Sequence, residues 1–169
     1  MKIQVIGKAQ NRIALGIAHA YLKMYPKSTL DDLVKVFPNS LNPDSGVKAI
    51  FVEKDKINTV CSENWNGFFT NDNTILKLED GKEVLFVSMW TKKSFDNFVD
   101  KAKEYGIEIE KLEKSVGLPD EGFILKDLRE PHKRKSNKIW VCILVLILLL
   151  CLCLIISFFT AVRRNFTTA

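Results

Sequence analysis

The sequence predicts an α+β domain followed by a single C-terminal transmembrane helix. Apolar residues recur at helical spacing in the first 40 residues, and two alternating segments flank an Asp-Gly turn further along. From Ile139 to Ile156, 18 consecutive residues are apolar, and a domain of this size cannot bury a helix that is apolar on every side. We therefore divide the 169-residue chain into a domain over residues 1–112, a linker with a basic juxtamembrane segment over 113–138, a transmembrane helix over 139–162 and a short tail over 163–169.

The first part of the domain predicts a short strand and two or three helices. Residues 1–7 alternate weakly, which is typical of a short edge strand. Residues 11–24 follow a helical period, with apolar side chains at Ile13, Ile17, Ala20, Tyr21 and Met24. Thr29 is a good N-cap for a second helix that Pro38 ends, with Asp32 three positions after the cap. Residues 47–53 fit either a third short helix or a strand.

The second part of the domain predicts a hairpin, a helix and a final strand. Residues 75–78 and 84–90 flank Glu79-Asp80-Gly81-Lys82, and Asp-Gly between alternating segments is a strong hairpin signal. Ser94 is the expected N-cap of a helix that Gly106 ends. Residues 107–112 alternate as the last strand. Residues 116–128 show only a marginal apolar patch and are expected to be linker.

The apolar segment predicts a membrane anchor with a defined orientation. Its 24 residues would span about 36 Å as a helix, against a hydrocarbon core of about 30 Å. Basic residues are more numerous before the segment than after it, so the amino-terminal side is expected in the cytoplasm. With no apolar secretory signal at the start, we expect a tail-anchored, single-pass protein. The residues that we expect to set anchorage and topology are Lys133, Arg134, Lys135, Lys138, Trp140, Arg163 and Arg164.

The expected partners follow from this placement. The lipid bilayer is the first, and the basic juxtamembrane residues could also bind anionic lipid headgroups. Ser157 and Ala161 form a small-xxx-small pair that would allow homo-oligomers through helix pairing. The soluble domain is left with an unknown protein or small-molecule ligand as its partner.

Net charge argues against nucleic acid. The sequence pI is about 9.0, but residues 1–130 carry 19 Lys and Arg against 20 Asp and Glu. The basic character therefore comes from the flanks of the apolar segment and serves topology rather than phosphate binding.

A winged-helix regulator that binds DNA remains the alternative. Two or three helices before a hairpin is the right order, and residues 47–56 would supply the recognition helix with Lys48, Lys54 and Lys56. The near-neutral domain makes this interpretation the weaker one.

No catalytic constellation is recognisable, so we expect no enzyme, no cofactor and no metal. His and Cys spacings typical of metal sites do not occur, nor do phosphate-binding or nucleophile-elbow motifs. Cys61 with His19 could form a nucleophile pair in a hydrolase, but a semi-buried thiol and a core histidine explain them as well. Asp31 and Asp32 are better explained by the positive end of a helix dipole.

One segment is a candidate recognition surface. Residues 58–73 are rich in Asn and aromatic side chains, and such a loop can form a ligand pocket or a partner surface. Aromatic side chains that tie a long loop to the core are the alternative. The candidate residues are Trp65, Phe68, Phe69 and Trp90.

Residues 11–110 carry a set of motifs that resembles a known type of module. The motifs are Thr-Leu-x-x-Leu-x-x-x-Phe-Pro, an aromatic pair, Leu-x-Asp-Gly-Lys before a strand ending in Trp90, and a helix closing on Tyr-Gly-Ile-Glu-Ile. They resemble a small α/β module of uncharacterised bacterial proteins, some of them restriction, phage-defence or mobile-element proteins. In that module the strand ends in Asn-Gln-Trp-Gly, where this chain has Ser88-Met89-Trp90-Thr91. The resemblance implies an accessory sensing or recognition domain in a bacterium. We therefore expect a cytoplasmic ligand- or partner-recognition domain anchored in the bacterial inner membrane, as a sensor or effector of such a system.

Overall fold

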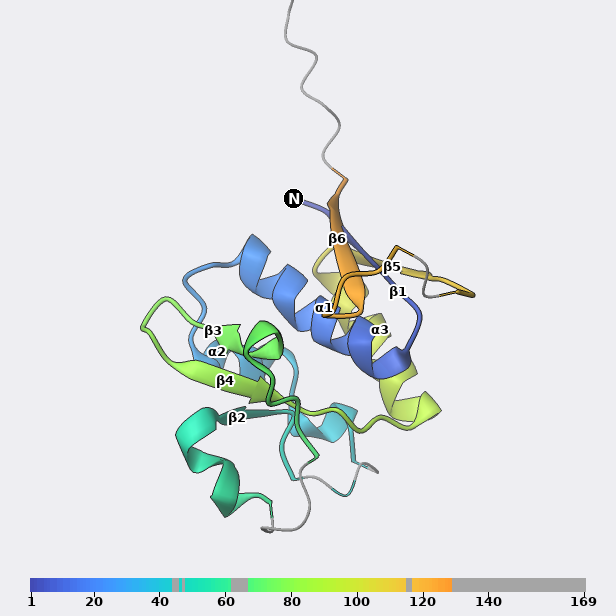
Figure 1. Cartoon of the computed structure of the whole chain (residues 1–169). Helices are drawn as coiled ribbons and strands as arrows, with labels where there is room; N and C mark the ends of the chain where they lie inside the picture. The colour runs from blue at the N-terminus through green and yellow to red at the C-terminus, as the bar shows by residue number, and fades with distance from the viewer. Residues whose placement is uncertain (44–45, 47, 62–66, 115–116, 129–169) are drawn as a thin grey trace, which may run out of the picture. The chain divides into compact units, whose positions relative to one another are not determined.

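The computed structural model describes residues 1–43, 46, 48–61, 67–114 and 117–128 (Figure 1). These residues belong to one compact unit, Met1–Arg129. The expectation of a mixed α+β domain is confirmed, with helices and two small sheets. The predicted transmembrane helix, the tail and the basic residues from Lys133 to Arg164 lie outside the described residues. Within the described part, no helix has the length and apolar character needed to cross a bilayer.

The first sheet has three strands in the order β5-β1-β6. β1 (Ile3–Gly7) pairs in parallel with β5 (Ile107–Lys111) and antiparallel with β6 (Phe123–Asp127). The prediction of an edge strand at residues 1–7 is therefore wrong, because β1 has a hydrogen-bonded partner on each side. The described structure also corrects the predicted domain end at residue 112, since β6 forms within the segment that we expected to be linker.

Helix α1 (Gln10–Met24) covers one face of this sheet through its apolar residues. Gly16 allows the close approach, because a Cβ there would lie 2.6 Å from the Cγ1 of Val5 and 2.9 Å from the Cγ of Phe123. Any larger side chain at this position would push α1 away from β1 and β6.

The second sheet confirms the predicted hairpin. β4 (Glu83–Phe86) lies between β2 (Phe51–Glu53) and β3 (Leu76–Lys77), with both pairings antiparallel. Gly81 has φ +82° at the turn, a conformation that glycine adopts without strain. The segment 47–53 was expected to be either a third short helix or a strand. Phe51–Glu53 within it form a strand, which completes the sheet.

The remaining helices follow local capping signals. α2 (Leu30–Val36) begins with the predicted capping box between Thr29 and Asp32. α3 (Lys92–Glu104) is capped by Thr91, whose hydroxyl accepts a hydrogen bond from the Ser94 N–H, so Ser94 lies inside the helix and its predicted cap role is wrong. Short 3-10 turns are η1 (Asn39–Leu41), η2 (Lys54–Thr59) and η3 (Asp72–Thr74).

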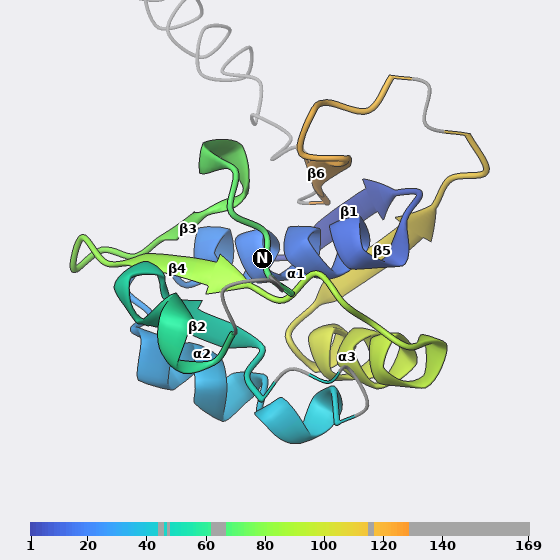
Figure 2. The same ribbon diagram turned by 60° about the horizontal axis from the view of Figure 1, so that its bottom comes forward.

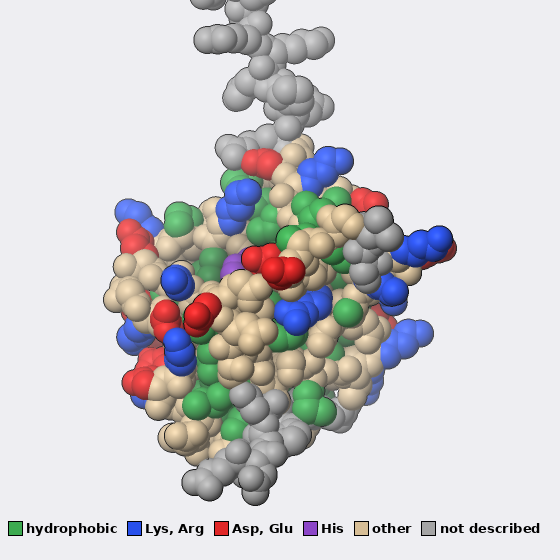
Figure 3. Space-filling view, in the orientation of Figure 1, with side chains coloured by type: hydrophobic (Ala, Val, Ile, Leu, Met, Phe, Trp, Pro, Cys, Tyr) green, Lys and Arg blue, Asp and Glu red, His purple; other side chains and the backbone are tan. Residues whose placement is uncertain are grey.

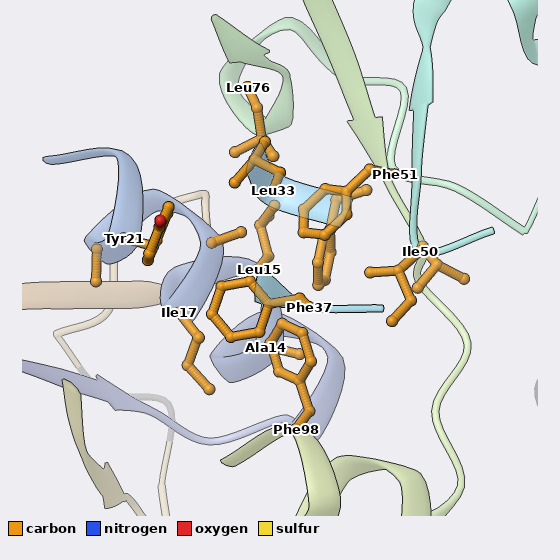
Figure 4. Close-up of a cluster of buried hydrophobic side chains, with 14 of the residues drawn as sticks. Ala14, Leu15, Ile17, Tyr21, Leu33, Phe37, Ile50, Phe51, Leu76 and Phe98 are labelled. Atoms are coloured by element: carbon orange, nitrogen blue, oxygen red, sulfur yellow. The ribbon is translucent and has the colours of Figure 1, made fainter. Parts of the chain in front are cut away.

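One hydrophobic core joins the two sheets and the helices. Figure 2 shows β1 and β5 near α3 on one side, and β2, β3 and β4 above α2 on the other, with α1 running across both groups. Phe37 at the end of α2 packs on Phe98 of α3 at 4.7 Å between ring centroids. The close-up of this cluster shows residues from α1, α2, α3 and the second sheet converging on it (Figure 4). Both sheets are thereby held by the same buried side chains.

Candidate functional site: a tyrosine pocket

A hollow of about 700 Å³ opens where the end of α1, the turn that follows it, α2 and the end of α3 meet. This volume is in the range of small-molecule sites. We call it the tyrosine pocket, and its main lining residues are Tyr21, Tyr25, Lys27, Asp32, Lys35 and Tyr105.

The three tyrosine rings touch one another and form one aromatic surface. The centroid of Tyr21 lies 4.7 Å from Tyr25 and 5.5 Å from Tyr105, the second in an edge-to-face arrangement. Tyr25 and Tyr105 are 6.3 Å apart and nearly perpendicular. Tyr21 is only 6% exposed, whereas Tyr25 is 42% exposed. Tyr21 therefore anchors the surface, and Tyr25 presents it to solvent.

The aromatic surface packs on the hydrophobic core through Phe37. Phe37 is fully buried and lies 5.5 Å from Tyr21 and 6.2 Å from Tyr105, measured between ring centroids. Figure 4 shows Tyr21 on α1 close to the helix that carries Leu33. Such ring contacts contribute about 0.5–1.5 kcal/mol each beyond burial, so the pocket floor is part of the core.

The polar side chains of the pocket differ in whether they already form hydrogen bonds or ion pairs within the protein. The Asp32 carboxylate accepts hydrogen bonds from the N–H and the hydroxyl of Thr29 at 2.9 and 2.8 Å, and these bonds lower the pKa of that carboxyl. Lys27 and Lys35 are exposed, and neither forms an ion pair with any residue of the described ranges. Burial raises the pKa of Tyr21, while the nearby Ser28 side chain acts in the opposite direction. The pocket thus combines phenol rings, two lysines that form no ion pair among the described residues, and a carboxylate that is already hydrogen-bonded.

A second hollow, of about 400 Å³, lies at the second sheet and is lined by Glu53, Lys54, Asp55, Lys82 and Glu83. We call it the charged hollow. Lys54 pairs with Glu83 at 2.6 Å, and Lys82 pairs with Glu53 at 3.2 Å. A hydrogen bond from Lys56 is the main reason that the pKa of Glu53 is lowered. Both lysines of this hollow are therefore paired within the protein.

The structure places the predicted aromatic surface mainly in the core. Phe68 is 5% exposed and Phe69 is 9% exposed, and the Arg12 guanidinium lies 4.5 Å from the Phe69 ring centroid. Trp90 is half-buried against Phe86 and Phe98, and its indole N–H donates to the Val87 carbonyl at 3.1 Å. Trp65 lies outside the described residues. Burial of the two phenylalanines matches the alternative, in which aromatic side chains tie the loop to the core.

The winged-helix interpretation loses its recognition helix. Phe51–Glu53 form strand β2, and Lys54–Thr59 form the 3-10 turn η2. Lys54 and Lys56 are paired with Glu83 and Glu53, so their charges are not free for phosphates. On the face drawn in Figure 3, acidic and basic side chains are interspersed. The described part of this segment therefore does not form the recognition helix that the alternative needs, because Phe51–Glu53 pair with β4 and Lys54–Thr59 form a short 3-10 turn.

His19 and Cys61 occupy separate surroundings. The His19 ring packs on Phe123 of β6 at 5.3 Å between centroids, and its buried Nε2 has no hydrogen-bond partner among the described residues. Burial lowers the pKa of His19, and Glu121 acts in the opposite direction. Cys61 follows η2, is partly buried and packs against the core cluster. In the described part of the chain, no group of three or more His, Cys, Asp or Glu residues is arranged to hold a metal ion.

Sequence reasoning did not identify the tyrosine pocket. Tyr21 and Tyr25 are one helical turn apart, which is a detectable signal. Tyr105 is 80 positions further along, and only the packing of α3 beside α1 brings it to them. Compared with known protein families, characterised proteins and solved structures, the chain matches none of them.

Proposed function

We propose that the protein is a recognition module, anchored in a bacterial inner membrane through residues 139–162 and binding its ligand or partner in the cytosol at the tyrosine pocket. The observation that carries this proposal is the pocket itself, where a half-exposed ring and two lysines without an ion pair among the described residues surround a hollow of ligand size. Binding sites commonly combine an apolar surface with a few polar groups, and this pocket has both.

The role as a sensor or effector of a defence or mobile-element system is part of the same proposal. It is supported by the motifs of residues 11–110, which resemble a recognition module of such proteins. A signal read in the cytosol and delivered at the membrane would suit a domain joined to an apolar segment.

A screen with the full chain tests recognition at the pocket. The chain, solubilised in a mild detergent, is screened for thermal stabilisation by a metabolite library and for capture of soluble proteins. We expect a stabilising or captured species that Tyr25→Ala abolishes, because Tyr25 supplies the exposed part of the aromatic surface. Met89→Ala is a matched control, since Met89 is 41% exposed, close to the 42% of Tyr25, and does not line the pocket. Equal effects of the two substitutions would contradict the proposed site.

Membrane attachment is tested separately by extraction. We expect the full chain to stay in the membrane pellet at alkaline pH, because 18 consecutive apolar residues favour insertion. Leu148→Arg with Leu149→Arg should release it, since each arginine at a helix centre costs about 2.5–3.5 kcal/mol of insertion free energy. Leu148→Ile with Leu149→Ile is the control, and release of this variant would argue against a span.

A further inference from the structure

We infer that the tyrosine pocket recognises a planar organic anion, meaning an aromatic or heteroaromatic ring that carries a phosphate or carboxylate group. This inference rests on the proposed function and names the ligand class that the same site would take.

Ring geometry favours a flat ligand over a cation held in a cage. An aromatic cage surrounds a quaternary ammonium group with rings that leave a gap for it. Here Tyr25 lies 4.7 Å from Tyr21 and 6.3 Å from Tyr105, so the rings fill the space between them. The Lys101 ammonium lies over the Tyr105 ring, 5.6 Å from its centroid. What remains accessible is therefore mainly the outer surface of Tyr25, and another planar ring can stack there.

The charges select an anion. Lys27 and Lys35 line the pocket, and neither has an ion-pair partner in the described ranges. The one carboxylate of the lining, Asp32, is engaged by two donors of Thr29 at the start of α2. The charge of Lys35 also acts on Asp32 and helps to lower the pKa of that carboxyl. A phosphate or carboxylate would meet two ammonium groups that form no ion pair among the described residues, and such charge-assisted hydrogen bonds are stronger than neutral ones. Positive charge at the rim also repels a cationic ligand.

The tyrosine hydroxyls add polar contacts without adding charge. Tyr21 is buried and its raised pKa keeps the phenol protonated well above neutral pH. A protonated phenol can donate to an anionic oxygen, whereas a phenolate would repel it. The lining of the pocket is thus compatible with an anion throughout the physiological pH range.

The charged hollow lacks both features. Three of its five lining residues are acidic, and Lys54 and Lys82 are held by Glu83 and Glu53. None of its described lining residues is aromatic. The described lining therefore offers an anion neither an unpaired lysine nor a stacking surface.

Titration calorimetry with the full chain in detergent tests the ligand class. The probes are adenosine 5′-monophosphate, uridine 5′-monophosphate and indole-3-acetate, with adenosine and inorganic phosphate as the two halves of the first probe. We expect at least one of the three ring-bearing anions to bind. If adenosine 5′-monophosphate is that ligand, its affinity should exceed that of either half by at least about tenfold, because only the whole molecule uses the rings and the lysines together.

Charge-reversed variants separate the ligand class from the site. Lys27→Glu with Lys35→Glu should weaken binding of the anion by about tenfold or more. Lys8→Glu with Lys77→Glu, at two exposed lysines outside the pocket, makes the same change in net charge and should leave binding within about twofold. Tyr25→Leu should weaken the whole nucleotide and the uncharged nucleoside alike.

Two results would overturn the inference. One is the absence of binding by all three ring-bearing anions at millimolar concentration. The other is an equal loss in both charge-reversed variants, which would indicate a nonspecific field. If Tyr25→Ala abolishes binding of a different class of ligand in the earlier screen, the ligand class proposed here is wrong and the recognition site stands.

Discussion

The tyrosine pocket and the charged hollow both lie at the surface of one small domain. They differ in whether their lysines form ion pairs within the protein. The charged hollow joins β2, β4 and η2 through lysine–carboxylate pairs, and its cations have partners within the protein. The tyrosine pocket combines touching aromatic rings with lysines that have no ion-pair partner among the described residues. Side chains with unused interaction capacity, rather than volume or charge alone, are the reason that we propose the tyrosine pocket, and not the charged hollow, as the recognition site.

The difference also reflects how each region is supported. The charged hollow depends on exposed ion pairs, which typically contribute little to folding stability. The tyrosine pocket packs on Phe37, a fully buried ring that contacts both Tyr21 and Tyr105 and forms the floor of the pocket. A rigid floor holds a binding surface in shape before the ligand arrives, which reduces the entropy lost on binding.

We expect the largest effect from a substitution that removes the Phe37 ring from the floor of the pocket. Phe37→Ala should lower the free energy of unfolding by about 3–5 kcal/mol, because it leaves a cavity in the core. It should also weaken ligand binding at the tyrosine pocket, since Tyr21 and Tyr105 lose the ring that positions them. Urea denaturation and calorimetry measure the two effects.

Leu85→Ala is the control for this variant. Leu85 is fully buried in the second sheet, so its truncation should cost about 2–5 kcal/mol of stability. Ligand affinity should be retained, because Leu85 does not line the tyrosine pocket. If both variants lost affinity equally, the floor would have no special role.

A smaller effect is expected on acidification. The native pKa of His19 is lowered from 6.5 by burial, so just below pH 6.5 the unfolded chain binds a proton that the native chain does not. Stability should therefore fall as the pH drops below 6.5 and level off below the native pKa. One proton limits the slope to about 1.4 kcal/mol per pH unit.

This acid response sharpens the comparison because Glu53 and Glu83 of the charged hollow and Tyr21 of the tyrosine pocket should keep their charge in that window. The pKa values of Glu53 and Glu83 are lowered from 4.5, and that of Tyr21 is raised from 10.0. His19→Leu should abolish the part of the slope below pH 6.5, measured by urea denaturation between pH 5 and 7. An unchanged slope in this variant would place the titrating group elsewhere.

The smallest expected effect concerns the charged hollow. Glu53→Gln removes the carboxylate shared by Lys56 and Lys82, which leaves the hollow with freed cations but no aromatic surface. We expect little change in stability and a change of less than about twofold in the affinity of the chain for adenosine 5′-monophosphate, by calorimetry. A second binding event in this variant would show that free cations suffice and that the rings are not required.

Local patterns predicted several elements correctly. The capping box at Thr29 and Asp32, the turn at Gly81 and the helix end at Gly106 all depend on residues within a few positions of one another. Their hydrogen bonds and backbone conformations form without distant partners, so the residue types alone indicate them.

Elements that depend on distant partners were predicted poorly. β6 became a strand by pairing with β1, more than 100 positions away, and Phe51–Glu53 became a strand by pairing with β4. The pattern of residues 123–127 is too short and too mixed to reveal such a partner. Similarly, the aromatic loop offered candidates for recognition, but local sequence does not tell whether Phe68 and Phe69 face solvent or the core.

The sequence by itself determined where the domain carries charge, where its helices and its hairpin turn begin and end, and where an 18-residue apolar segment lies between basic flanks. Those features depend on composition and on neighbours in the chain. Only the tertiary structure decided that β1 is the central strand, that Phe68 and Phe69 are buried, and that Tyr105 joins Tyr21 and Tyr25 in one pocket. These outcomes required α1, α2 and α3 to pack on a common core, and that packing depends on contacts between residues far apart in the chain.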